Sequence, residues 1–232
     1  MVGPKSLPKT TVFIDGFNFY YASFRDGPYG GYRWLNLEKF CDRLLPRNDV
    51  RLIRYFTARV SPLPWDLGQR DRQEAYLFAL GTLPRVKIHE GSFYVRESLR
   101  ALATKPKKGS RWVKVVDPEE KGSDVNLATY LLRDGFQGRY EVAVVVSDDS
   151  DLLEPVRIVR RELHLPVGVV NVRQRRSVFR RDADFFIRPD RWHYAESQLS
   201  GTVALASGRR VRCPRVWSAA RRAAGTDTGR PE

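Results

Sequence analysis

The sequence is poor in cysteine and histidine. Among 232 residues it has two cysteines, Cys41 and Cys213, and three histidines, His89, His164 and His193. Two cysteines are too few for a disulfide framework, and none of these side chains stands at the spacing that zinc ligands need. The composition therefore argues against a disulfide-stabilised scaffold and against a zinc site.

The sequence also lacks a long apolar run. No stretch approaches the roughly 20 consecutive apolar residues of a membrane-spanning helix. The first residues lead directly into a short apolar strand, without the apolar core of a signal peptide. We therefore expect a cytoplasmic protein that has no membrane partner.

Negative charge is scarce relative to positive charge. The chain has 41 Lys and Arg against 27 Asp and Glu, which gives a formal net charge of +14. Such a balance favours a polyanionic partner, because Lys and Arg neutralise phosphates and release their counterions. Nucleic acid is the expected partner, and a membrane surface or an acidic protein is the alternative that charge alone leaves open.

The apolar pattern alternates between strand-like and helix-like segments. Strands are expected at Thr10–Ile14, Val50–Val60, Val86–His89, Trp112–Val116, Val142–Val146 and Val167–Val172. Helices are expected at Phe17–Phe24, Leu37–Leu45, Asp66–Leu83, Asp124–Phe136 and Leu152–Leu163. The unbroken Val and Ala run at 142–146 is typical of a strand that is covered on both faces. The pattern predicts an α/β three-layer domain with a central, mainly parallel sheet between helices.

The last part of the chain has a different composition. From about residue 197 the apolar periodicity stops, and Gly, Ala, Ser and Arg dominate a segment that has little to bury. We expect one domain over residues 1–196 and a basic, disordered C-terminal tail over residues 197–232. A solvated terminus is the preferred interpretation of this tail, and a nucleic-acid-binding arm is the alternative. The oligomeric state stays open, with a homodimer as one option.

Aspartates follow the expected strands or open the expected helices. Asp15 comes after the first strand, Asp124 begins a helix, and Asp148–Asp151 (Asp-Asp-Ser-Asp) follows the Val-rich strand. Open α/β sheets bind ligands at the carboxyl ends of their strands, and carboxylates gathered there repel one another unless a cation neutralises them. Mg²⁺ or Mn²⁺ fits this set, because both are hard cations that prefer oxygen ligands.

Each aspartate also has a plainer interpretation. Asp15-Gly16 is a common kind of strand-ending turn, and Asp124 is suited to capping its helix. Asp151, followed by Glu154, resembles a capping box. Capping does not explain three aspartates within four residues directly after a buried strand, so the metal-site hypothesis is preferred.

Several segments resemble the NYN domain family, which is related to the PIN-domain and FEN-type nucleases. They are Val12–Tyr21, Glu119–Ala128 and Val145–Leu152, and a weaker match covers Ser177–Phe186. Their order along the chain is more specific than any one of them alone. The resemblance implies a PIN-like fold and a ribonuclease that hydrolyses RNA phosphodiester bonds with Mg²⁺ or Mn²⁺ as cofactor.

The resemblance also implies which residues form the site. The metal-binding, catalytic positions are Asp15, Asp124, Asp149 and Asp151. Asn18 matches the position of a polar partner near the metal. Many relatives carry Gly where this chain has Asp148, so Asp148 is left out of the expected site. The second-rank candidates are Ser147, Ser150 and Asp184.

Basic side chains near the expected site are candidates for holding the RNA backbone. They are Lys121, Arg173, Arg175 and Arg176. The three arginines follow a predicted strand, so they are expected over the same edge as the aspartates, with a solvated helix face as the alternative. A second basic loop contains Lys105, Lys107, Lys108 and Arg111. It is interpreted as a clamp on the RNA strand, with a mobile excursion of the chain as the alternative.

Two other functions are consistent with the same residues. The first is a non-catalytic module that binds RNA or a protein partner on the same fold. The second is a phosphohydrolase of the haloacid-dehalogenase type, which also uses an Asp after its first strand. Asp15-Gly16-Phe17 lacks the second Asp of that motif. A metal-dependent, RNA-cleaving enzyme is therefore the preferred hypothesis.

Overall fold

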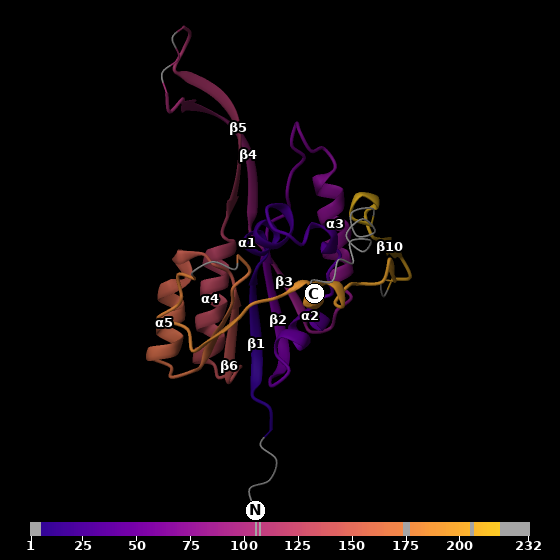
Figure 1. The fold of residues 1–232 in the computed structure, drawn as a ribbon, viewed down its shortest axis with the longest axis vertical. Helices are drawn as coiled ribbons and strands as arrows, with labels where there is room; N and C mark the ends of the chain where they lie inside the picture. The colour runs from indigo at the N-terminus through magenta and orange to yellow at the C-terminus, as the bar shows by residue number, and fades with distance from the viewer. Residues whose placement is uncertain (1–5, 105, 107, 174–176, 205–206, 219–232) are drawn as a thin grey trace, which may run out of the picture.

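A computed structural model describes residues 6–104, 106, 108–173, 177–204 and 207–218. At its centre lies a six-stranded sheet in the order β3-β2-β1-β6-β7-β8, in which all neighbouring strands are parallel (Figure 1). The strands of this sheet are β1 Lys9–Asp15, β2 Asp49–Thr57, β3 Val86–Glu90, β6 Val142–Val146, β7 Val167–Val170 and β8 Phe185–Ile187. The α/β class and the parallel central sheet that the sequence predicts are confirmed.

Helices cover both faces of the sheet. They are α1 Gly16–Tyr20, α2 Leu37–Leu44, α3 Gln69–Leu80, α4 Ser123–Phe136, α5 Leu153–Arg161 and α6 Arg191–Ala195, with shorter helical turns at η1 Tyr21–Arg25, η2 Gly30–Tyr32 and η3 Ser150–Leu152. Helices α2 and α3 lie on one face, and α4 and α5 lie on the other (Figure 1). No helix in the described part of the chain is long and apolar enough to cross a membrane.

Successive residues of the central strands belong alternately to two hydrophobic layers. Val12 and Ile14 of β1 belong to the layer that contains α2 and α3, whereas Phe13, between them, belongs to the layer that contains α4 and α5. Successive side chains of a strand point to opposite faces, so a strand between two helical layers must be apolar at every position. The Val-Ala run of β6 meets this requirement, and all 5 of its residues are buried.

The direction of sheet growth reverses between β1 and β6. From β1 the sheet continues through β2 and β3 on one side, and from β6 it continues through β7 and β8 on the other. Ligands bind in open α/β sheets at such a switch point, at the carboxyl ends of the two strands. Ile14 of β1 is in register with Val146 of β6. Asp15 and Ser147 therefore leave the sheet side by side.

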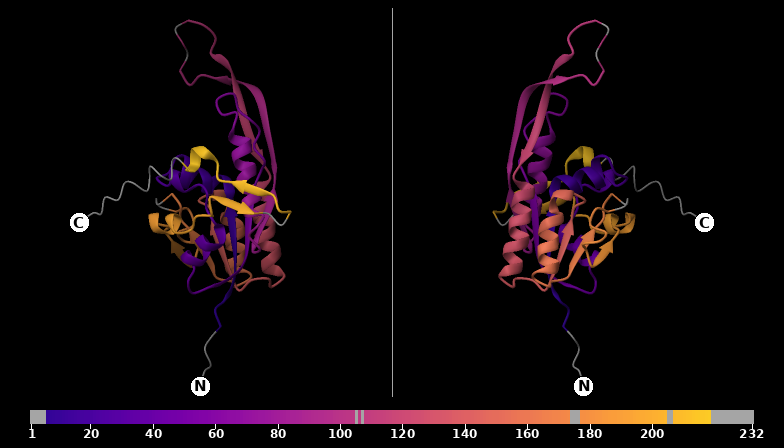
Figure 2. Two further views of the ribbon diagram at one scale, coloured as in Figure 1. Left: turned by 90° about the vertical axis from the view of Figure 1, so that its right-hand side faces the viewer. Right: turned by 90° about the vertical axis from the view of Figure 1, so that its left-hand side faces the viewer.

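Two strands leave the body of the protein as a long hairpin, which we call the arm. Strand β4 Ser92–Ala101 pairs antiparallel with β5 Trp112–Lys121, and the arm projects away from the central sheet in every view (Figure 2). The sequence predicts only the shorter strand Trp112–Val116. It does not predict β4, because Arg96 and Glu97 interrupt the apolar residues of that segment. Residues 105 and 107 lie outside the described residues.

The segment that follows residue 197 does not match the expected disordered tail as far as it is described, which corrects that expectation. Strand β9 Thr202–Ala204 pairs with β10 Arg210–Arg212, and Leu199 and Trp217 are buried in the layer of α2 and α3. These apolar residues stand too far apart to produce a periodic pattern, yet each packs on a core that the rest of the chain forms. Residues 205–206 and 219–232 of the expected tail lie outside the described residues.

Candidate metal centre

Three carboxylates meet at the carboxyl ends of β1 and β6. Asp15, Asp124 and Asp149 each offer one oxygen, and these oxygens lie within 4.8 Å of one another. Asp15 ends β1, Asp149 follows β6, and Asp124 lies in the first turn of α4. Segments that are distant in the sequence thus supply one site, which we call the acidic cluster.

Asp15 is buried and held by its neighbours. One carboxylate oxygen accepts a hydrogen bond from the backbone N–H of Asn18 at 2.9 Å, and the other accepts one from the hydroxyl of Ser147 at 2.9 Å. A Cβ atom on Gly16 would lie 2.6 Å from the carbonyl oxygen of Phe56. Glycine is therefore needed where the strand turns into α1, and this turn sets the direction of the Asp15 side chain.

Ser147 connects two of the carboxylates. Its buried hydroxyl donates to Asp15 and accepts a hydrogen bond from the backbone N–H of Asp149 at 3.1 Å. Asp149 in turn caps η3, because its side chain accepts from the N–H of Asp151 at 3.0 Å. These hydrogen bonds hold Asp15 and Asp149 on the same side of the strand ends, so Ser147 is a positioning residue.

The capping interpretation accounts for only part of the cluster. Asp15 and Asp149 each cap a short helix through a single oxygen. Asp124 does not cap α4, because the N-cap of that helix is Gly122 and Asp124 lies inside the first turn. Asp151 forms no capping box with Glu154 and is exposed within η3. Capping therefore does not explain why Asp124 approaches the other two carboxylates.

Burial and like charge raise the pKa of two carboxyls in the acidic cluster. Burial is the largest cause for Asp15, whose pKa rises to about 6, and the charges of Asp149 and Glu120 act in the same direction. Burial followed by the charges of Asp15 and Asp149 raises the pKa of Asp124 to about 7. The charges that act most strongly on both groups are all negative. A cation in the cluster would relieve this repulsion.

The donor set of the cluster suits a hard divalent cation. All three side chains offer carboxylate oxygen, and the group contains no Cys or His. Oxygen-only sets are typical of Mg²⁺, Ca²⁺ and Mn²⁺, whereas zinc and copper prefer sites that contain nitrogen or sulfur ligands. The residues present therefore fit a divalent metal of the hard class.

Glu120 is a further acidic residue at this site that the sequence analysis does not single out. It lies near the end of β5, and its charge raises the pKa of both Asp15 and Asp124. Its carboxylate accepts a hydrogen bond from the N–H of Ser123 at 2.9 Å, which ties the end of β5 to the start of α4. Its place within the Glu119–Ala128 segment, shortly before Asp124, is the feature of the sequence that points to it.

The predicted residues Asn18, Ser150 and Asp151 lie near the acidic cluster, as does Asp148, which the prediction left out. The side-chain oxygen of Asn18 accepts a hydrogen bond from the N–H of Asp148 at 3.2 Å. The carboxylate of Asp148 accepts from the N–H of Arg173 at 3.4 Å, so it faces the loop after β7. Asp151 and Ser150 are exposed in η3, outside the group of three.

The basic residues predicted to hold RNA are only partly described. Lys121 is exposed at the end of β5 and forms an ion pair with Glu119 at 2.7 Å. Arg173 is exposed and lies beside Asp148. Arg175 and Arg176 lie outside the described residues. Lys121 and Arg173 thus lie on two chain segments that border the cluster.

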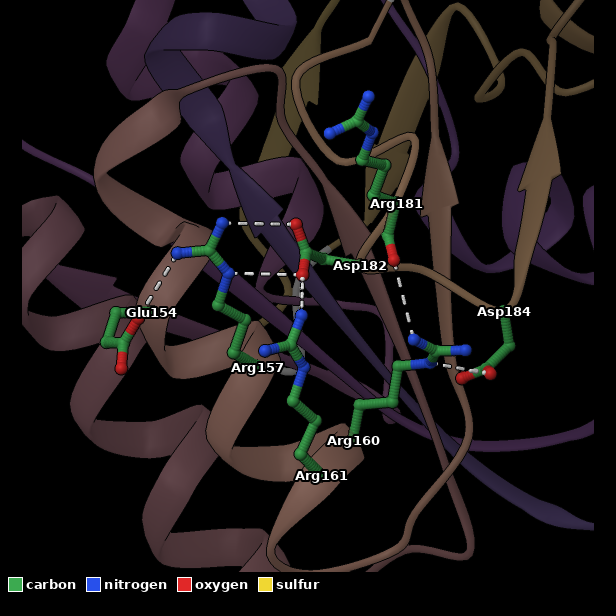
Figure 3. A network of polar contacts seen from close by, with 7 residues as sticks. All are labelled: Glu154, Arg157, Arg160, Arg161, Arg181, Asp182 and Asp184. Carbon is green, nitrogen blue, oxygen red and sulfur yellow. Dashed lines mark hydrogen bonds and ion pairs between the residues drawn. The ribbon is translucent and has the colours of Figure 1, made fainter.

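Asp184 lies at the opposite end of the strands from the acidic cluster. Its carboxylate accepts hydrogen bonds from Nε of Arg160 at 2.8 Å and from the N–H of Val167 at 2.9 Å. Figure 3 shows this pair beside Asp182, which other arginines of α5 bind. Because Val167 is the first residue of β7, Asp184 is at the amino ends of the strands. The structure therefore does not bring it to the acidic cluster, and its contacts tie α5 to the sheet.

A cavity of about 510 Å³ lies beside α1, and no carboxylate of the acidic cluster lines it. Gly16, which follows Asp15, forms part of its wall. About half of the lining residues are aromatic, among them Phe17, Tyr20, Tyr21, Tyr55, Trp65 and Trp217, and charged residues such as Arg25, Arg72 and Asp66 also line the cavity. A cavity of this volume is large enough for a small organic ligand, and its aromatic wall suits a flat ring.

The parallel sheet and the carboxylates at its switch point define a PIN-like α/β domain with an acidic site. The chain belongs to the NYN domain family, whose sequence model matches residues 9–190. Members of this family are generally nucleases. The resemblance inferred from the sequence segments is thereby confirmed at the level of the family.

Individual proteins are also similar to this chain. The 6-hydroxy-3-succinoylpyridine 3-monooxygenase HspA of Pseudomonas putida (strain DSM 28022 / S16) is 29% identical over 187 residues, which cover 70% of this chain and 59% of that protein. The chain thus spans 59% of the length of this curated relative. A protein of unknown function from Vibrio parahaemolyticus RIMD 2210633 has a crystal structure that matches with a TM-score of 0.50 and 13% identity, over 82% of this chain and 98% of that one. The second similarity shows the fold alone.

Proposed function

We propose that this protein is a metal-dependent ribonuclease that hydrolyses RNA phosphodiester bonds with Mg²⁺ or Mn²⁺. The observation that carries the proposal is the approach of oxygens from Asp15, Asp124 and Asp149 to within 4.8 Å at the switch point of the sheet. Membership of a family of nucleases supports it. The net charge of +14 supports a polyanionic substrate.

In this proposal the protein holds and orients the metal ligands. Ser147 and the N–H of Asn18 keep the Asp15 carboxylate in place, and Glu120 anchors the start of α4 so that Asp124 faces it. A divalent cation bound there supplies a Lewis acid that lowers the pKa of a water and neutralises charge on the phosphoryl oxygens. No side chain of the cluster needs to act as the nucleophile.

The exposed residues around the cluster are proposed to meet the substrate. Lys121 and Arg173 hold phosphates of the RNA backbone, which fixes its position without reading its sequence. Asp151 is proposed as an additional carboxylate of the site, because its charge already acts on Asp124. The cavity beside Gly16 is proposed to offer room for one base of the substrate.

The test is cleavage of end-labelled single-stranded RNA with Mn²⁺, with Mg²⁺ and with a chelator. Product is expected with metal and not with the chelator. Asp15→Asn and Asp149→Asn should abolish cleavage while circular dichroism shows an intact fold, and Asp71→Asn on the exposed face of α3 serves as the matched control. RNA binding without metal-dependent product would favour the non-catalytic module instead. Full activity in Asp149→Asn would refute the assigned role.

A second candidate is an enzyme that acts on a small heteroaromatic compound. The aromatic cavity of about 510 Å³ favours it, and the Pseudomonas putida relative is named a monooxygenase of a substituted pyridine. Titration with 6-hydroxy-3-succinoylpyridine, followed by tryptophan fluorescence, separates the candidates. Saturable quenching by this compound, together with RNA that stays intact in Mn²⁺, would favour the second one.

A further inference from the structure

The arm begins at the acidic cluster. Glu120, near the end of β5, is close enough for its charge to raise the pKa of Asp15 and Asp124. Phe93, directly opposite Glu120 in the β4–β5 register, stacks on Phe17 with ring centroids 6.2 Å apart. Phe17 is also part of the cavity wall. The base of the arm, the cavity and the cluster are therefore continuous.

The two faces of the arm differ in chemistry. Directly opposed residues of an antiparallel pair share a face, and the faces alternate along each strand. One face includes the ion pair between Arg100 and Asp117. The other face, which includes Phe93, carries Val95, Leu99 and Trp112, which are 38%, 62% and 58% exposed. It also carries the ion pair between Lys114 and Glu97 at 3.3 Å. Both faces thus carry an ion pair, and the face with Phe93 also presents Leu99 and Trp112 to solvent.

The distal half of the arm is positively charged. From Ser98 to Val116 the sequence has no Asp or Glu, and its charged residues are Arg100, Lys105, Lys107, Lys108, Arg111 and Lys114. Lys108 and Arg111 are exposed near the turn that joins the two strands. Exposed cations beside exposed aromatic and apolar side chains are the chemistry that binds single-stranded nucleic acid, because cations hold phosphates and flat side chains stack on bases.

The distal half of the arm lies far from the acidic cluster. The part of β5 between Trp112 and Glu120 spans ~27 Å at ~3.4 Å per residue. A dinucleotide at the cluster cannot reach Trp112, whereas a long strand can. An isolated two-stranded hairpin is also only marginally stable in water, so a ligand that covers its apolar face would stabilise it.

We propose that the arm is a binding surface for single-stranded RNA that extends from the acidic cluster. Bases stack against Trp112 and contact Leu99, and Lys108 and Arg111 hold the phosphates. The identity of the polymer as RNA rests on the proposed function. Binding along the arm does not require a metal, so it can be measured separately from cleavage.

The test measures fluorescence anisotropy of a labelled single-stranded RNA longer than the arm, in the presence of a chelator. Trp112→Ala is expected to weaken binding about 5- to 150-fold, the range for the loss of one stacked base. Trp192→Ala is the matched control, because Trp192 is 55% exposed on α6, away from the arm. This control should leave the affinity unchanged.

A second pair of variants tests the phosphate contacts. Arg111→Ala should reduce the slope of log affinity against log salt concentration by ~0.7, as expected for one lost contact to a single strand. Arg47→Ala is its control. Arg47 is exposed in the loop before β2, at the amino ends of the strands, whereas the arm begins at their carboxyl ends. Unchanged affinity in Trp112→Ala and an unchanged slope in Arg111→Ala would overturn the proposal.

Three further measurements separate the arm proposal from the ribonuclease proposal and from dimerisation through the arm. If RNA binding depends on Trp112 but no product forms with Mn²⁺, the arm binds RNA and the ribonuclease proposal fails. If a dinucleotide and long RNA are both cleaved while Trp112→Ala changes nothing, the ribonuclease proposal stands and the arm proposal fails. A wild-type dimer that Trp112→Ala dissociates without loss of RNA affinity, detected by sedimentation, would assign the apolar face to a second copy of the chain.

Discussion

Replacing Asp15 with Asn should stabilise the metal-free protein at neutral pH. Asp15 is 3% exposed, and burial is the main cause that raises its pKa from 3.8 to about 6. A shift of ~2 pKa units corresponds to about 3 kcal/mol of unfolding free energy that the ionised group removes. Asn keeps one carbonyl oxygen but cannot accept from Ser147 at the second position, which costs about 1 kcal/mol. The expected net gain is about 2 kcal/mol.

The pH dependence of this gain has a definite sign. Asp15 holds its proton more tightly in the folded protein than in the unfolded chain, because its folded pKa is raised. The metal-free wild type therefore loses stability as the pH rises from about 4 to about 6, and above that window the loss is complete. Asn does not titrate, so its advantage should be absent at about pH 4 and full at about pH 7.5. Urea denaturation of both proteins in chelator measures the difference at each pH.

Asp71→Asn provides the comparison for this experiment, because Asp71 is exposed on α3 and should show no gain at either pH. A variant Asp15→Asn that is less stable than the wild type at about pH 7.5 would refute the reasoning. So would a stability difference that is the same at both pH values. Either result would mean that burial does not raise the pKa of Asp15 in the folded protein.

Other consequences of the structure can be measured directly. Mn²⁺ at about a hundred times its dissociation constant should raise the unfolding free energy of the wild type by ~2.7 kcal/mol, seen as a higher Tm that chelator reverses. Gly16→Ala should destabilise the fold by about 2–4 kcal/mol in urea, since its Cβ would lie 2.6 Å from the carbonyl oxygen of Phe56. Asp134→Ala should cost about 3–5 kcal/mol by calorimetry, because it leaves Arg54 buried without its 2.6 Å ion pair. Trp217→Ala should cost about 3 kcal/mol if the segment after residue 197 belongs to the fold, and no cost would mean that it does not.

The sequence predicts the acidic cluster because local chemistry and sheet topology agree. Asp15 and Asp149 follow runs of apolar residues that are buried on both faces, and parallel strands bring their carboxyl ends to one edge. A capping role for Asp124 was the competing interpretation, and the structure assigns the cap of α4 to Gly122. The distance between the carboxylates follows from the β1–β6 pairing, which no single segment of the sequence encodes.

Several features depend on contacts that leave no periodic pattern. Glu120 joins the edge of the cluster because the arm returns the chain to that point. Asp184 resembles the site residues in sequence, but it lies at the amino ends of the strands, where Arg160 binds it. Leu199 and Trp217 are single apolar residues in a polar segment, and they are buried because a core already exists for them to cover.

The sequence by itself determined the α/β class, the parallel sheet and the positions of Asp15, Asp124 and Asp149 at strand ends and a helix start. Those properties depend on the spacing of apolar residues, which is local. Only the tertiary structure decided which carboxylates share a site, where the arm leads and how Leu199 and Trp217 pack on the core. These depend on strand order and on long-range packing, in which residues distant in the sequence become neighbours.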